Sequence, residues 1–173
     1  MQLKNTKEAL QKFARYVVTQ SRSNLTRQKK VNTKKLYSSI KFEIEEFGRE
    51  LMLIRLGEEY LDYVDKGVSG TERKYPTPFT YKQKKPPLKN ILQWVKAKNF
   101  RLRDEKGRFT KGNYRSIAFV LQNSIYKKGF KPSLFFTRPF QLGLQRFRED
   151  IAEAFMKDID NRLDIDKNLP ESK

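Results

Sequence analysis

Four aspartates near the end of the sequence are the residues whose type and spacing could do chemistry: Asp158, Asp160, Asp164 and Asp166. Asp164, Asp166 and Asn168 match the first three ligand positions of a calcium-binding loop. The pattern then fails, because Leu169 stands where the sharp turn needs glycine and the sequence ends before the bidentate Glu. We therefore expect the solvated end of a helix here. The alternative is a two-metal nuclease site, since carboxylates four residues apart share a helix face.

Other kinds of catalytic site are poorly supported by the composition. The sequence contains no His and no Cys, which removes the commonest general base, thiol nucleophiles and the usual zinc ligands. Gly67 and Gly70 do not have the spacing of a phosphate-binding loop. The Tyr and Ser residues lack an identifiable activating partner. We therefore predict a protein without enzymatic activity, metal or cofactor.

A basic and aromatic segment, residues 73–85 (RKYPTPFTYKQKK), is the stronger candidate for a binding function. Basic side chains neutralise phosphates and aromatic rings stack on unpaired bases, but the same composition also suits an acidic protein surface. A second charged segment, residues 101–112, is expected to be a hairpin or a loop. No motif for reading a nucleic-acid sequence is present. The candidate partner- or DNA-facing residues in the two segments are Arg73, Lys74, Lys82, Lys84, Lys85, Arg103, Lys106, Arg108 and Lys111.

The charge of the chain is concentrated in two blocks. The 173 residues carry a formal net charge of +18, with +9 in residues 1–40, −5 in residues 41–65, +15 in residues 66–131 and −1 in the remainder. Such a field favours polyanionic partners. Hydrophobic residues make up 37%, which predicts one domain, residues 1–173, with a lean core. No apolar run could span a membrane, so we expect a soluble protein made in a cytosol-like compartment, with no membrane partner.

Apolar spacing predicts helices at both ends and in the middle of the chain. They are expected at residues 6–20, after Pro87, from the cap Asn113 to residue 128, and in a long final helix after Pro139. Residues 21–35 are either an extension of the first helix or a loop. The apolar stripe of the last helix comprises Phe140, Leu144, Phe147, Ile151, Ala154, Phe155 and Ile159.

Alternating residues 40–44 and the apolar residues 51–56 predict two antiparallel strands joined by a turn at Gly48. A short helix over residues 58–66 should end at Gly67. The expected fold is α+β: a small antiparallel sheet packed with long N- and C-terminal helices, two or three shorter helices and long basic loops.

Four segments, taken in order, resemble the tail-completion or neck (head–tail joining) proteins of tailed bacteriophages. Residues 33–40 (TKKLYSSI) resemble the family's T-G-x-L-x-x-S-I, with Lys34 where Gly is usual. Residues 60–67 (YLDYVDKG) are similar to Y-x-x-x-V-E-x-G, with Asp65 in place of Glu.

The third and fourth segments extend the resemblance to about residue 140. Residues 86–100 (PPLKNILQWVKAKNF) are similar to P-P-x-x-x-I-x-x-W-V…K-G-I, with Asn99 in place of Gly. Residues 117–136 (IAFVLQNSIYKKGFKPSLFF) resemble I-A-x-x-I…I…G-x-x-P…F-F. The similarity covers about residues 33–140 and leaves out the N-terminal helix with its basic segment, residues 1–32, and the C-terminal helix with its acidic tail, residues 141–173. Because Lys34 and Asn99 remove two glycines, we expect the local turns to differ.

The resemblance implies a structural virion protein, assembled in the cytoplasm of the bacterial host. Its subunits would form a homo-oligomeric ring beneath the portal, contact the portal and other neck or tail proteins, and surround the DNA channel, with nonspecific contact with genomic DNA. Blocks 41–65 and 66–131 could then meet between neighbouring subunits. Loops 68–86 and 101–112 are expected to add little to the fold of one subunit and to carry contacts between subunits. The alternative function is that of a nonspecific nucleic-acid-binding domain acting through its basic face.

Overall fold

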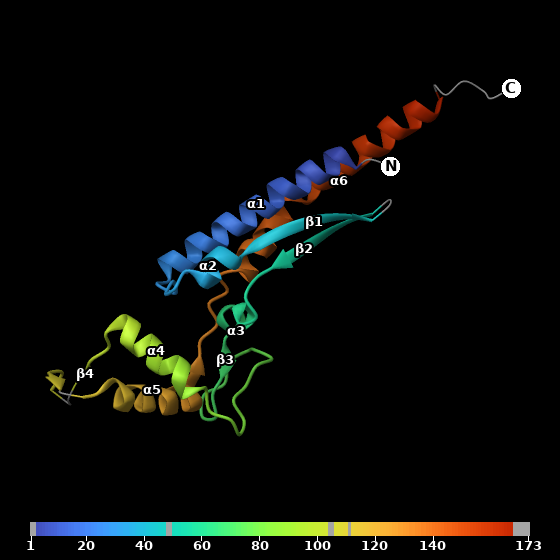
Figure 1. The fold of residues 1–173 in the computed structure, drawn as a ribbon. Coiled ribbons are helices and arrows are strands. Elements are labelled where there is room, and N and C mark those ends of the chain that lie inside the picture. Colours follow the sequence, from blue (N-terminus) through green and yellow to red (C-terminus); the bar gives the residue numbers. More distant parts are fainter. Residues whose placement is uncertain (1–2, 48–49, 104–105, 111, 168–173) are drawn as a thin grey trace. The chain divides into compact units, whose positions relative to one another are not determined.

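The computed structural model describes residues 3–47, 50–103, 106–110 and 112–167, and it has the predicted α+β fold (Figure 1). Long N- and C-terminal helices pack together, and the described strands form two-stranded antiparallel sheets. The chain divides into two compact units: unit 1 comprises residues 1–58 and 135–173, and unit 2 comprises residues 59–134. The expectation that residues 1–173 form one domain stays a prediction. Within the described ranges, no helix has both the length and the apolar character needed to cross a membrane.

Unit 1 is built on the antiparallel pair α1 (Lys4–Arg27) and α6 (Thr137–Lys167). The buried ring of Phe13 lies 5.6 Å from the Phe140 ring and 6.3 Å from the Phe147 ring, in edge-to-face geometry. At Gly143 the helices approach closely, since a Cβ there would lie 2.9 Å from the Phe13 ring. Residues 21–27, left open by the sequence, are helical. The predicted stripe of α6 is wrong at two positions, because Leu144 and Phe155 are exposed.

A hairpin of β1 (Lys41–Phe47) and β2 (Glu50–Leu56) lies along α1, where the sequence predicted two antiparallel strands. The register pairs Ile44 with Leu53 and Phe47 with Glu50; the predicted turn at Gly48 lies outside the described residues. Before β1 is a short helix, α2 (Lys35–Ser39), which the sequence did not predict.

Unit 2 contains two packed helices and several short elements. Helix α4 (Leu88–Lys98) packs on α5 (Tyr114–Lys128) around a core of Ile91, Val95, Ile117 and Ala118. The predicted cap of α5 is confirmed: Asn113 Oδ1 accepts a hydrogen bond of 2.8 Å from the Ser116 N–H. The remaining elements are α3 (Leu61–Lys66), β3 (Val68–Ser69), β4 (Leu102–Arg103), β5 (Phe109–Thr110) and β6 (Gly129–Phe130).

Two stretches of backbone cross closely in unit 2, where β3 pairs with β6. Gly129 has φ +68°, and a Cβ on it would overlap the Val68 carbonyl oxygen. Gly70 has no room for a Cβ either, because the Lys127 carbonyl occupies that space. Glycine is therefore required at this crossing both for its left-handed conformation and for its small size.

Candidate polyanion interface

The loop of residues 70–86 is fixed to the last turns of α5. Its start is held by backbone N–H groups of Thr71 and Glu72, which donate to the Tyr126 and Lys127 carbonyls at 3.0 and 2.9 Å. Its end is held by Tyr126, whose hydroxyl donates to the Lys82 carbonyl at 2.7 Å. The expectation that this loop adds little to the fold is wrong. Backbone hydrogen bonds anchor the loop to α5, and such bonds leave no hydropathy pattern in the sequence.

Three of the five predicted cations in this loop support the loop itself. Lys74 Nζ donates to the Gly70 carbonyl at 3.0 Å, and the Arg73 guanidinium lies over the Tyr75 ring at 5.2 Å. Lys85 Nζ donates to Asn123 Oδ1 at 2.8 Å, over the Tyr126 ring. Lys82 and Lys84 are exposed, and their ammonium groups make no hydrogen bond or ion pair with the described residues. These two are therefore the cations of the loop best placed for an outside partner.

The second predicted segment is a hairpin, as one of the two expectations had it. Residues 101–110, which we call the basic arm, contain the paired strands β4 and β5. The guanidiniums of Arg101 and Arg103 lie 5.7 and 4.5 Å from the centre of the Phe109 ring, which is 60% exposed. Lys106 and Arg108 are also exposed, whereas Lys111 lies outside the described residues. Arg101 was not among the candidate residues predicted from the sequence. It lies two residues before Arg103, and in an extended segment this spacing places both side chains on the same face.

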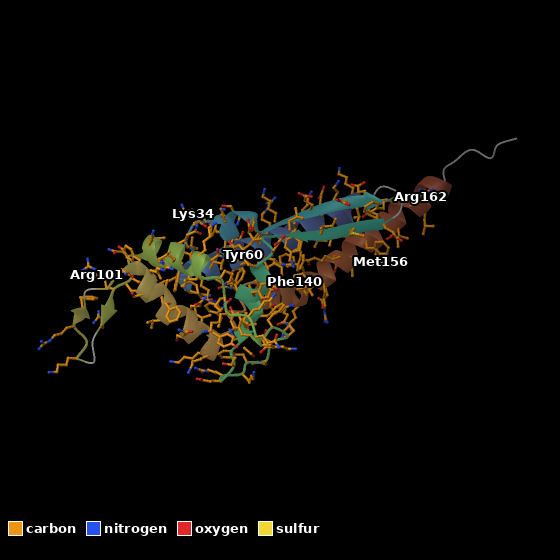
Figure 2. The ribbon with its side chains drawn as sticks, turned by 60° about the horizontal axis from the view of Figure 1, so that its bottom comes forward. Lys34, Tyr60, Arg101, Phe140, Met156 and Arg162 are labelled. Atoms are coloured by element: carbon orange, nitrogen blue, oxygen red, sulfur yellow. The ribbon has the colours of Figure 1, made fainter. Side chains whose placement is uncertain are left out.

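The structure does not gather the predicted site residues into one cluster. The basic arm precedes the first residue of α5, and loop 70–86 is bonded to residues 122–127 at the other end of that helix. Residues 122–127 lie 8–13 residues beyond Tyr114, so about 12–20 Å of helix separates the attachment points of the two groups. Figure 2 shows Arg101 where the chain leaves α4 for the arm, whose side chains extend away from the helices. The basic surface is therefore extended, a shape that suits an elongated partner.

Few carboxylates offset this positive charge. Unit 2 has 18 basic and 6 acidic side chains. Between residues 66 and 131, Glu72 is the acidic residue that the structure describes; it pairs with Lys127 at 2.9 Å, and this contact raises the pKa of Lys127. Burial raises the pKa of the Tyr81 hydroxyl, which stays neutral at physiological pH.

The aspartate cluster does not behave as expected at its first member. Asp158 is only 4% exposed, and its carboxylate accepts hydrogen bonds of 2.6–3.0 Å from Asn5 and Thr6 at the start of α1. Burial acts to raise the pKa of Asp158, but these hydrogen bonds outweigh it and the pKa is lowered. The side chains of Asp164 and Asp166 lie outside the described residues. Among the residues that are described, no three acidic side chains come together as metal ligands would.

Comparisons with protein-family models, curated proteins and solved structures return no match for this chain.

Proposed function

We propose that this protein is a structural subunit of a tailed-bacteriophage virion, a ring-forming neck protein that joins the portal to the tail around the DNA channel. In this role the protein needs no catalytic residue, metal or cofactor. It needs a stable subunit with surfaces for its own copies, for the portal and for the neighbouring neck or tail proteins. The resemblance of residues 33–140 to the neck family is the starting point of the proposal.

The observation that carries the proposal concerns the four positions at which the resembling motifs have glycine. Gly67 and Gly129 have φ values of +74° and +68°. Lys34 and Asn99, which stand where the family has glycine, have φ values of +60° and +50°. Both residues therefore have the left-handed conformation that glycine adopts without strain.

Chance agreement of this kind is rare. Only a few per cent of non-glycine residues have positive φ. In the described part of the chain there are four, namely Lys29, Lys34, Asn99 and Leu134, and two of them fall at the motif positions. The two motif positions that lack glycine in this chain thus have the backbone conformation that favours glycine. This supports a shared fold.

Three of the four resembling segments, the second, third and fourth, also meet in space. Ile91 and Val95 of the third segment share a core with Ile117 and Ala118 of the fourth. Gly67 of the second segment touches the fourth, since a Cβ on it would lie 2.5 Å from the Phe130 carbonyl oxygen. The resembling residues of these three segments thus form contacts with one another within unit 2, which supports the resemblance.

The test is assembly with a portal. The purified protein, mixed with portal particles of the phage that encodes it and examined by electron microscopy, should add a ring of density at the portal's tail-facing end. In a phage lacking the gene, Lys82→Glu with Lys84→Glu should lower the yield of infectious particles at least tenfold. Lys12→Glu, an exposed α1 residue in unit 1, is the matched control and should restore the normal yield. A protein that never joins the portal and is absent from virions contradicts the proposal.

A second candidate function, nonspecific nucleic-acid binding, is favoured by the excess of basic residues in unit 2. Binding to unrelated duplexes should then be equal and should fall steeply with salt, because it depends on counterion release. A strong preference for one sequence at physiological salt would count against it.

A further inference from the structure

The ring contacts and the ion pair that join the β1–β2 hairpin to α1 and to Phe136, just before α6, in the described residues all involve one of its two sides. Residues directly opposite each other in a sheet share a face, so the register separates the hairpin into two sides. Phe42 and Ile44 are half-buried, and the Phe42 ring lies 6.4 Å from the Phe13 ring of α1. The opposite side, which we call the acidic face, is formed by Lys41, Glu43, Glu45, Phe47, Glu50, Met52, Ile54 and Leu56, and it carries three carboxylates against one ammonium group.

The acidic face combines two features that favour a partner. Met52 is 51% exposed and the neighbouring Phe47 is 53% exposed, so the hairpin leaves apolar surface in water. Glu43 and Glu45 lie opposite Ile54 and Met52 respectively, and both carboxylates are exposed. A surface that fits this face must bring cations together with an apolar group.

The basic arm of unit 2 has the complementary composition. Phe109 of β5 is paired with Arg103 of β4, the guanidiniums of Arg101 and Arg103 lie at its ring, and all three side chains are exposed. Arg101 and Arg103 are two residues apart, as are Glu43 and Glu45, and this spacing is about 6.6 Å along a strand. The acidic face thus has two carboxylates beside an apolar row, and the basic arm has two guanidiniums beside an aromatic ring.

We propose that the acidic face of one copy of this chain binds the basic arm of a second copy. Arg101 and Arg103 pair with Glu43 and Glu45, while Phe109 packs on Met52 and Ile54. The two surfaces differ, so the contact is head-to-tail and propagates from copy to copy, closing into a ring when the rotation allows. As the joint of the ring, the contact rests on the proposed function.

The absence of Cys from the sequence allows a direct test by cross-linking. Met52→Cys and Phe109→Cys are made as separate single-cysteine proteins, mixed at high concentration and oxidised. Because the two cysteines are on different chains, the mixed disulfide reports contact between copies. We expect it in at least tenfold greater yield than the disulfide between Phe109→Cys and a control cysteine at exposed Gln145 of α6.

Charge reversal sharpens the test. Glu43→Lys with Glu45→Lys should reduce the mixed disulfide to the control yield, and Arg101→Glu with Arg103→Glu on the other protein should restore it. Exposed positions are used throughout, and circular dichroism checks that each variant is folded. A mixed disulfide no more abundant than the control, or outnumbered by disulfides between two copies of Met52→Cys, overturns this contact. The contact is also overturned if duplex DNA protects the cysteine at position 109 from oxidation while no mixed disulfide forms.

The outcome is separable from that of the proposed function. If portal-bound rings form while the 52–109 disulfide stays at the control yield in those rings, the ring proposal stands and this joint is wrong. If the disulfide forms but no variant joins a portal, the contact between copies stands and the neck function is wrong.

Discussion

Units 1 and 2 are held together in different ways. Unit 1 is held together by side chains. The Phe13, Phe140 and Phe147 rings pack between its two long helices, and the Asp158 carboxylate accepts hydrogen bonds from the N–H groups of Asn5 and Thr6 in α1. Unit 2 has a small helical core, and its loops are joined by backbone hydrogen bonds around Gly70 and Gly129. Two parts of one chain can therefore have the same kinds of element and yet be sensitive to different substitutions.

The largest expected effect is in unit 2, at its backbone crossing. Gly129→Ala places a Cβ against the Val68 carbonyl at positive φ, and we expect a loss on the order of 4 kcal/mol or more in the free energy of unfolding. Hydrogen exchange should rise in peptides from residues 59–134 and much less in those from α1 and α6. Gly107→Ala is the control, since it has φ +78° with open space around it and should cost only about 1–2 kcal/mol. Equal losses for the two variants would refute the role given to the crossing.

A smaller effect is expected in unit 1, at its carboxylate cap. Asp158→Asn removes charge-assisted hydrogen bonds and should cost about 1.5–3 kcal/mol in urea unfolding at pH 7, whereas Asp160→Asn, at an exposed position two residues further along α6, should cost almost nothing.

The pH dependence of the same site follows from the lowered pKa of Asp158. Its stabilising contribution is present above the ordinary value of 3.8 and is lost as the pH falls through the lower pKa of the folded state. The difference in stability between the wild type and Asp158→Asn should therefore shrink below about pH 4. A difference that stays constant down to pH 2 would show that the charge of Asp158 is not the cause.

The smallest effects are expected at Lys34 in unit 1 and Asn99 in unit 2, the two positions where the motifs have glycine and this chain does not. Lys34→Gly should stabilise unit 1 by about 0.5–1 kcal/mol, because a lysine pays a conformational penalty at φ +60° that exceeds the entropy cost of glycine. Asn99→Gly in unit 2 should change stability by about half as much or less, since asparagine tolerates this region. Thermal unfolding of both variants gives the answer, and a destabilised Lys34→Gly would show that its side chain has a role of its own.

The sequence predicted helices and the hairpin well because their signal is local. Spacing located α4, α5 and α6, and alternation located β1, each to within a few residues. It failed for the pairing of β3 with β6, since two-residue strands leave no periodicity, and for Asp158, whose partners at Asn5 and Thr6 are more than 150 residues away. For the candidate site, charge counts identified the basic segments. They could not tell that Lys85 supports its own loop or that α5 separates the two groups.

Unit 1 is assembled from the first and last parts of the chain, and this has a consequence for its synthesis. Thr6 meets Asp158 across 152 residues, so α1 leaves the ribosome long before the α6 surface that covers it exists. Residues 59–134 are complete earlier and form contacts of shorter range, so unit 2 is expected to fold first during translation. Until α6 is made, the apolar face of α1 has no native helix to cover it. A chain cut short before Phe135 would therefore be a substrate for chaperones and proteases, even with the whole of unit 2 in place.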